Sequence, residues 1–353
     1  MRKNRILKLR GYLEREGYFP YFISDLSNIY YLSGFTGSTA YLIITENENI
    51  FVTDFRYDLQ SKKEVSKDFN IVVGNNYNEM FKKLLSDFDK VFIEPSGDLT
   101  TFISLQNLNK EVLVASNDYV KELRMIKDQD EILAIKEAYL IAEESFLGVL
   151  KSGFFNKTER EVAGYLEYLM KINGSRKPSF DSIIASGFRG ALPHGVASEK
   201  IINENEPVIV DFGCKIQYCS DITRVIYNGD DKHILNIIEI VKSALMYAKE
   251  AVKPGVKCKE VDKVARDYIA SKGFGDFFNH GLGHGVGIDV HEKPSFNPRD
   301  ETVLQEGMVM TIEPGIYFEN EFGVRLEDTV LVTKDGCITL NEKLKDYVYK
   351  IQN

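Results

Sequence analysis

Apolar and polar positions in the first third of the chain alternate in a way that predicts a small domain of strands and helices. Residues 5–16 have the spacing of an amphipathic helix that ends at Gly17. Two β-rich runs, 39–45 and 50–54, flank a polar turn and predict a hairpin. Further strands are predicted at 18–23, 70–73, 91–93 and 112–115, and further helices at 77–85 and 100–108. Strands that alternate with helices indicate an α/β domain.

The pattern changes near Tyr119, where helical spacing begins and continues to Lys151. No Pro-, Gly- or Ser-rich linker marks the change. We place the domain boundary after Leu123, so the predicted domains are residues 1–123 and 124–353.

The second domain repeats itself at an offset of 102 residues, from Lys151 to Lys253. The same offset carries an apolar run ending at Asp211 onto one ending at Glu313. Three further matches are Asp221-Ile-Thr with Glu327-Asp-Thr, His194-Gly-Val with His284-Gly-Val, and helical patterns at 130–150 and 234–252. Two copies of one unit are expected to pack about a pseudo-two-fold axis, so that equivalent residues face each other.

Four carboxylates occupy equivalent positions in this repeat. Asp211 and Glu313 end apolar strands, and Asp221 and Glu327 are expected on the strands that follow, 217–226 and 323–332. Converging carboxylates repel one another unless they are protonated or bound to a cation. Together with an imidazole they form a set that suits two ions of manganese, cobalt, iron or zinc. The alternative is a set of ordinary buried ion pairs.

A glycine-rich stretch, residues 279–292, holds His280, His284 and His291. Its glycines disfavour a helix and allow tight backbone turns. We expect a loop or irregular strand that directs imidazoles inward.

Composition excludes several classes of protein. The formal net charge is −9 and no basic block is present, so neither nucleic acid nor an anionic membrane is an expected partner. No apolar run approaches the length of a membrane span, and the first residues lack the apolar core of a signal peptide. The four cysteines have no zinc-like spacing. These features favour a reduced, cytoplasmic protein.

At this point the residues resemble a known family. The second domain is similar to the creatinase-like "pita-bread" metallopeptidases, specifically the Xaa-Pro peptidases (prolidase and aminopeptidase P), and the first domain resembles their N-terminal domain. The motifs that carry the resemblance are Ala191-Leu-Pro-His-Gly, Asp211-Phe-Gly, Ser220-Asp-Ile-Thr-Arg, Gly283-His-Gly, Val290-His-Glu, Glu313-Pro-Gly-Ile-Tyr and Gly323-Val-Arg-Leu-Glu. The resemblance implies an α/β creatinase-type N-terminal domain followed by an α+β pita-bread catalytic domain with internal pseudo-two-fold duplication.

The same resemblance implies a dinuclear exopeptidase that hydrolyses the Xaa-Pro bond of peptides or dipeptides, and it favours a homodimer. Manganese is the expected metal, with cobalt or zinc as alternatives. Glu313 is also expected to carry the proton, His194 and His291 to flank the substrate and assist proton transfer, and His280 and Arg325 to support the site, with Arg325 close to substrate. The implied metal ligands are Asp211, Asp221, His284, Glu313 and Glu327.

Two departures from the family pattern bear on specificity. The turn between Asp211 and Asp221 is one residue shorter than in typical members, and Ser295 stands where many dipeptide-specific prolidases carry an arginine. Dipeptidase and aminopeptidase therefore both stay open. Two further alternatives are a methionine aminopeptidase-like enzyme and a non-catalytic peptide-binding module on the same fold.

Overall fold

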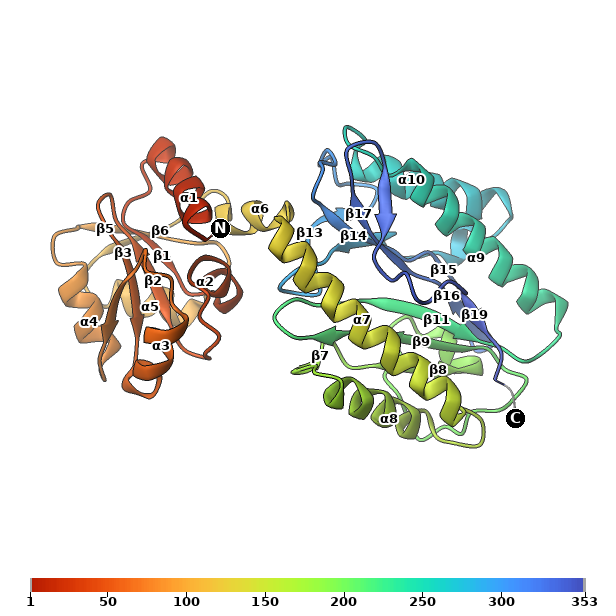
Figure 1. The fold of residues 1–353 in the computed structure, drawn as a ribbon. Coiled ribbons are helices and arrows are strands. Elements are labelled where there is room, and N and C mark those ends of the chain that lie inside the picture. The colour runs from red at the N-terminus through yellow and green to blue at the C-terminus, as the bar shows by residue number, and fades with distance from the viewer. Residues whose placement is uncertain (1, 352–353) are drawn as a thin grey trace. The chain divides into compact units, whose positions relative to one another are not determined.

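The first compact unit of the chain is built on a single six-stranded sheet. The computed structural model describes residues 2–351, and its contacts separate two units between Arg124 and Met125 (Figure 1). The helices of the first unit are α1 (Arg2–Glu16), α2 (Leu26–Ser33), α3 (Asp58–Glu64), α4 (Tyr77–Leu84), α5 (Leu99–Gln106) and, across the join, α6 (Tyr119–Met125). The strands are β1 (Tyr21–Ile23), β2 (Tyr41–Ile44), β3 (Asn49–Thr53), β4 (Asn70–Val73), β5 (Lys90–Ile93) and β6 (Glu111–Val114), with a short 3-10 turn, η1 (Phe55–Tyr57).

The sheet has the strand order β4-β3-β2-β1-β5-β6, and only β2 runs against its neighbours. Its apolar face packs against α4 and α5 around buried side chains such as Phe22, Phe81 and Leu105. The predicted hairpin corresponds to β2 and β3, whose register pairs Ile43 with Ile50. The α/β class predicted for this part of the chain is confirmed.

The second unit holds two sheets of similar design and the helices that cover them. The first half contains α7 (Gln129–Ser152), α8 (Glu159–Ile172), β7 (Lys177–Pro178), β8 (Ile183–Ser186), η2 (Gly187–Ala191), β9 (Val208–Phe212), β10 (Cys214–Lys215) and β11 (Ile222–Ile226). The second half contains α9 (Lys232–Ala251), α10 (Cys258–Ser271), η3 (Gly275–Phe277), β12 (Gly283–Gly285), β13 (Glu292–Phe296), β14 (Val309–Ile312), β15 (Gly315–Phe318), β16 (Phe322–Arg325), β17 (Asp328–Val332), β18 (Cys337–Thr339) and β19 (Val348–Tyr349).

The two sheets repeat one pairing scheme. In the first, β9 lies between β8 and β11, and in the second, β14 lies between β12 and β17. All four of these contacts are antiparallel. Helices α7 and α8 cover the first sheet, and α9 and α10 cover the second (Figure 1). The internal duplication predicted from the 102-residue offset therefore corresponds to a repeated strand–strand arrangement.

The long helix predicted from residue 119 to residue 151 is wrong in one respect, because it is broken between Met125 and Gln129. Asp128 caps the second helix: its carboxylate accepts the Glu131 N–H, while the Glu131 carboxylate accepts the Asp128 N–H. This reciprocal cap satisfies backbone donors that a continuous helix would pair internally. The break directs Lys127 away from the helix surface and into the second unit, where it contacts Glu292.

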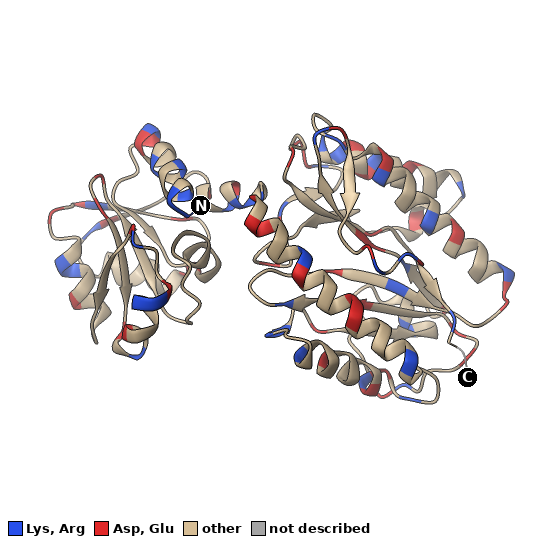
Figure 2. Cartoon of the chain, in the orientation of Figure 1, with Lys and Arg blue, Asp and Glu red and all other residues tan. Residues whose placement is uncertain are grey.

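In the part of the chain that the structure describes, no helix combines the length and the hydropathy that a membrane crossing would need. Acidic and basic residues alternate along the helices of both units, with no extended basic stretch (Figure 2). This distribution agrees with the acidic net charge of the sequence.

Candidate active site

The first half of the second unit presents two carboxylates beside one another. Asp211 lies on β9, where the register places it between Ile183 of β8 and Thr223 of β11. Asp221 directly precedes β11, and its backbone N–H donates to the Tyr139 hydroxyl. The short turn between the two aspartates therefore does not keep them apart.

The second half presents an equivalent pair and an imidazole. Glu313 directly follows β14, and Glu327 directly precedes β17. His284 is the central residue of β12, which pairs with β13 on one side and β14 on the other. Its N–H donates to the Thr311 hydroxyl, which in turn lies 3.3 Å from Glu313 Oε1.

The strands predicted at 217–226 and 323–332 are both shorter than expected. The second is interrupted at Leu326 and Glu327, because β16 pairs with β15 while β17 belongs to the main sheet. The Glu327 N–H donates to the Thr223 carbonyl of the other half. Asp221 and Glu327 thus lie in the connections that enter β11 and β17, rather than within strands.

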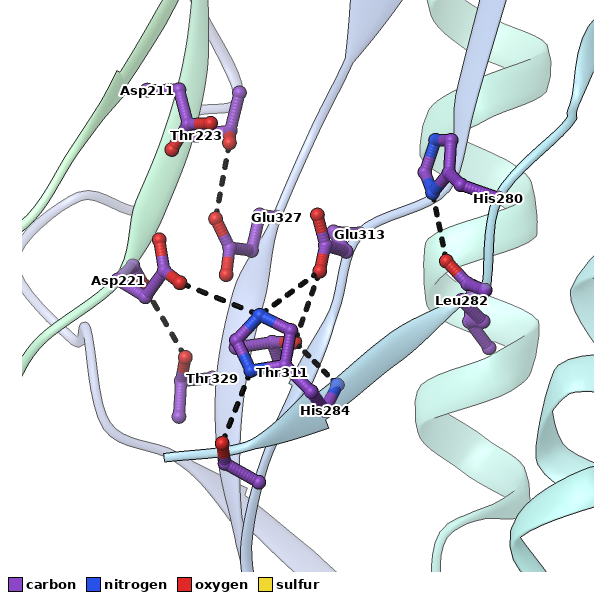
Figure 3. Close-up of polar contacts among 12 residues, drawn as sticks. Asp211, Asp221, Thr223, His280, Leu282, His284, Thr311, Glu313, Glu327 and Thr329 are labelled. Carbon is purple, nitrogen blue, oxygen red and sulfur yellow. Dashed lines mark hydrogen bonds and ion pairs between the residues drawn. The ribbon is translucent and has the colours of Figure 1, made fainter. Parts of the chain in front are cut away.

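Five side chains from the two halves converge (Figure 3). Asp211, Asp221 and Glu327 each contribute an oxygen, and these oxygens lie within 4.8 Å of one another. Nε2 of His284 lies 3.6 Å from Asp221 Oδ2 and 3.3 Å from Glu313 Oε1. One oxygen of Asp211 and one of Glu327 are buried and have no hydrogen-bond partner. Buried carboxylate oxygens without donors are costly, which points to a missing positive partner.

Burial and mutual repulsion act on these carboxylates together. Burial, followed by repulsion from Glu327 and Asp211, raises the pKa of Asp221 well above its ordinary value. Burial and the neighbouring carboxylates raise the pKa of Glu327 in the same way. Burial also acts on Glu313, but hydrogen bonding and attraction from His284 outweigh it and lower its pKa to about 2. The cluster is thus an acidic site that repels itself unless cations enter it.

The tautomer of His284 follows from its neighbours. Its Nδ1 lies 3.1 Å from the Gly285 carbonyl, which can only accept, so Nδ1 carries the hydrogen. In the neutral imidazole, Nε2 then has its lone pair directed at the carboxylates, which is the orientation of a histidine ligand held by an outer hydrogen bond.

Arg325, on β16, holds the outer side of the cluster. Its Nη2 donates to Asp211 Oδ2 at 2.6 Å, and its Nη1 donates to the Tyr317 hydroxyl and the Pro193 carbonyl at 3.0 Å each. The Tyr317 hydroxyl also lies 3.0 Å from Nε2 of His280. Arg325 and His280 therefore both reach the site through Tyr317, a residue that the sequence reasoning did not single out although it lies within the Glu313 motif.

A pocket of about 530 Å³ opens onto the carboxylate cluster. His194 and His291 both line it, and the His291 ring lies edge-on to His284 with ring centres 4.4 Å apart. His194 follows η2 in a loop, whereas His284 lies in a strand, so the similarity between His194-Gly-Val and His284-Gly-Val does not reflect structural equivalence. The place of β12 beside β14 is taken in the first half by β8 beside β9.

Two buried charges tie down the segments that carry these histidines, and neither was predicted. Glu159, fully buried at the start of α8, accepts from the Ser186 and Ser198 backbones and from Arg189, on either side of His194. Lys127 lies 3.2 Å from the carboxylate of Glu292, the residue after His291. Only pairing across the fold reveals such anchors, because their partners are distant in sequence.

The donor set fits divalent cations. Carboxylate oxygens and one imidazole are the ligands that manganese, cobalt, iron and zinc accept in hydrolytic sites. The unpartnered oxygens of Asp211 and Glu327 are the specific feature that a cation would satisfy.

Comparison with known proteins identifies the family. Residues 133–334 match the model of Metallopeptidase family M24, and residues 5–126 match that of the Creatinase/Prolidase N-terminal domain. The chain is 41% identical to the Xaa-Pro dipeptidase of Pyrococcus furiosus over 348 residues, which is 96% of this chain and 98% of that protein.

Solved structures agree with this match. An Xaa-Pro dipeptidase from Bacillus anthracis superposes with a TM-score of 0.94 at 34% identity, covering 99% of both chains. An X-Pro aminopeptidase from Thermotoga maritima superposes with a TM-score of 0.88 at 36% identity, covering 96% of this chain and 99% of that one. The predicted resemblance and fold class are confirmed: the chain is a metallopeptidase of the M24 family, with a creatinase/prolidase N-terminal domain ahead of its catalytic domain.

Proposed function

We propose that the protein is a two-metal exopeptidase that hydrolyses the bond between an N-terminal residue and a following proline. The observation that carries the proposal is the convergence of four carboxylates and one imidazole, with two buried carboxylate oxygens left without donors. Relatives named Xaa-Pro dipeptidase and X-Pro aminopeptidase supply the substrate class.

In the proposed site, Asp211, Asp221, His284, Glu313 and Glu327 hold the ions. Asp221 and Glu327 enter from opposite halves, so they suit the bridging positions between two cations. When bound, a pair of divalent ions lowers the pKa of water and polarises a peptide carbonyl. Manganese is the metal we propose, with cobalt or zinc as alternatives.

The chain's own groups would manage the protons. Glu313 takes a proton from the attacking water and delivers it to the imino nitrogen of proline as the C–N bond breaks. His194 and His291, on the pocket wall, donate hydrogen bonds to the substrate carbonyl oxygen as negative charge develops there. Arg325 keeps Asp211 oriented through the 2.6 Å contact.

An Xaa-Pro bond has no N–H, because proline nitrogen is fully substituted. A site that reads an amide hydrogen on the leaving side therefore rejects it, which accounts for a dedicated enzyme. We further propose a cytoplasmic homodimer that binds no nucleic acid and no membrane, and domains that separate near residue 123.

The direct test is hydrolysis with added metal. Purified protein is stripped of metal, reloaded with manganese or cobalt, and incubated with Ala-Pro, Ala-Pro-Ala, Ala-Ala-Ala and Met-Ala. We expect cleavage of one or both proline peptides and none of the others. Preference for Met-Ala would favour the methionine aminopeptidase alternative. Absence of cleavage, together with absence of two bound ions in metal analysis, would favour the non-catalytic binding module.

A further inference from the structure

The wall of the active-site pocket is almost free of positive charge. Among the described residues that line it, Arg325 is the only lysine or arginine. Ser295 and Asn297, both uncharged, come from β13 and the loop after it, and Asp181 adds an exposed carboxylate from the segment before β8. Arg299 and Lys293, the nearest cations in sequence, are exposed and do not line the pocket.

Arg325 is already committed to the protein. Its Nη2 donates to Asp211, its Nη1 donates to Tyr317 and to a backbone carbonyl, and its Nε lies 3.4 Å from the Thr223 hydroxyl. A guanidinium has five N–H donors, so these four contacts leave one. A substrate carboxylate is gripped by arginine through two parallel N–H donors on one edge. Arg325 cannot offer such an edge without releasing Asp211.

A free Xaa-Pro dipeptide carries its C-terminal carboxylate on the proline itself. That carboxylate must enter the pocket with the scissile bond, where it would lose water and meet no free cation. Desolvating an unpaired carboxylate is costly. In a longer peptide, the same position is an uncharged amide, and the terminal carboxylate stays outside in solvent.

We propose that this pocket selects peptides in which proline is followed by at least one further residue, over free Xaa-Pro dipeptides. The inference rests on the proposed function and narrows its substrate class to that of an Xaa-Pro aminopeptidase. The position that decides this selection is Ser295.

The strand register supports the choice of Ser295. It lies directly opposite His284 in the β12–β13 pair, and opposed residues of an antiparallel pair present their side chains on the same face of the sheet. Its side chain therefore shares the pocket face with His284. Its backbone N–H is bonded to Asp300 Oδ2 at 2.9 Å, which holds this part of β13 in place. A longer, charged side chain at 295 would project into the pocket from the same strand position.

The test compares three substrates of the manganese-loaded enzyme: Ala-Pro, Ala-Pro amide and Ala-Pro-Ala. The amide differs from Ala-Pro only in lacking the carboxylate charge. We expect kcat/KM for the amide and the tripeptide to exceed that for Ala-Pro by about tenfold or more, mainly through KM, because one unpaired charge is removed. Equal or faster hydrolysis of Ala-Pro than of its amide would overturn the inference. If none of the three is cleaved, the proposed function fails instead.

Substitution at Ser295 provides a second, independent measurement. Ser295→Arg should raise kcat/KM for Ala-Pro relative to Ala-Pro amide by about tenfold, since it introduces a free guanidinium on the pocket face. Ser295→Gln, which is long but uncharged, is the matched control and should leave this ratio as in the wild type. A ratio that rises equally in both variants would contradict the proposal, because size rather than charge would then decide selectivity. If Ser295→Arg does not fold, the wild-type comparison of acid and amide still decides.

Discussion

The two halves of the catalytic unit use one strand arrangement but neutralise their equivalent acids differently. Asp211, on β9, is held by the fixed guanidinium of Arg325, which lies in the other half. Glu313, after β14, is held by His284, whose Nε2 is 3.3 Å away. Both halves also place a threonine two residues after the second acid, and each hydroxyl contacts the other half: Thr223 bonds the Glu327 carboxylate and Thr329 bonds the Asp221 carbonyl.

This difference explains how a duplicated scaffold produces an asymmetric site. An arginine always carries its charge, so Asp211 is held as a structural carboxylate that still directs one free oxygen inward. An imidazole can bind a cation or exchange a proton, so Glu313 has a partner that changes with the chemistry. We therefore assign proton transfer to the Glu313 side and orientation to the Asp211 side.

The largest expected effect tests this assignment directly. Glu313→Gln removes the carboxylate that we propose as proton carrier, and it should lower kcat by at least about a thousandfold, within the range of a lost general base with a weakened metal site. The measurement is kcat on Ala-Pro-Ala at saturating metal, with thermal unfolding followed in parallel. Because glutamine has the same shape, the folded structure should persist.

The matched control is Glu319→Gln, a substitution on the exposed β15–β16 connection. It should retain wild-type kcat. If Glu313→Gln keeps more than about a tenth of wild-type turnover, the proton carrier lies elsewhere and the comparison between the halves loses its catalytic meaning.

Sequence patterns predicted the duplication and the convergence of acids because both depend on local repeats: an apolar run that ends in an acid, then a second acid before the next strand. The Gly-rich stretch was likewise predicted to direct imidazoles inward, which His284 does. These signals lie within a few residues of each other. The two metal-site acids that enter strands, Asp221 and Glu327, were placed one element too late because a chain that changes sheets can remain apolar throughout.

Contacts between distant segments had no sequence signal. The pairing of Lys127 with Glu292 depends on a helix break that the apolar periodicity does not mark. The His194-Gly-Val similarity was misleading for the opposite reason, since identical residues occur there in a loop and in a strand. Short identity reports composition, whereas structural equivalence depends on which strand lies beside which.

The second effect concerns stability and separates the halves at one position. Ile222 follows Asp221, but Asp328 follows Glu327 and pairs with Arg224 at 3.1 Å and Lys249 at 2.7 Å. Asp328→Asn should destabilise the catalytic unit by about 3 kcal/mol at pH 7, because the fully buried Arg224 loses its counter-charge. Denaturant unfolding measures the difference.

The pH dependence of that difference follows from the pKa of Asp328. Burial raises it, but attraction to Arg224 and Lys249 outweighs burial and leaves it below the ordinary value of 3.8. A depressed pKa contributes stability that is full above 3.8 and is lost as pH falls through the folded-state pKa. The gap between wild type and Asp328→Asn should therefore narrow below pH 3.8. The control Ile222→Val should cost only about 1 kcal/mol with no such pH dependence, and a constant gap for Asp328→Asn would exclude the ion pair as its cause.

The third effect is stabilisation by metal. Ions that bind only the folded protein should stabilise it by about 2.7 kcal/mol at a concentration of a hundred times Kd, and each kcal/mol should raise Tm by about 2–4 °C in a unit of this size. Glu327→Gln should reverse the order of stabilities. Without metal it removes a repelling carboxylate and should raise Tm, whereas with manganese it should lose most of the increment.

Differential scanning calorimetry with and without manganese gives all four values, and metal analysis gives the bound ions. Glu319→Gln again serves as control and should keep the full increment. A Glu327→Gln protein that retains both ions and the wild-type increment would show that the two halves do not share a bridging carboxylate.

The smallest effect returns to the two histidine segments, which the halves anchor with opposite charges. Glu159 holds the segment that carries His194, and Lys127 holds Glu292 beside His291, with its side chain only 1% exposed. Glu292 also packs so closely on Gly287 that a Cβ there would lie 2.4 Å from its carboxylate. Lys127→Met should therefore loosen His291 and lower kcat/KM by about tenfold, with metal content unchanged, because His291 is proposed to contact substrate and not the ions.

Lys127→Arg is the conservative comparison and should recover most of the lost rate, since it restores a positive charge to Glu292. Glu159→Gln should produce a loss of similar size through His194. If each substitution acts on one histidine, combining Lys127→Met with His291→Ala should add little to His291→Ala alone, while combining it with His194→Ala should multiply the two losses. The reverse pattern would mean that the buried charges maintain the fold of the whole pocket rather than the placement of one imidazole each.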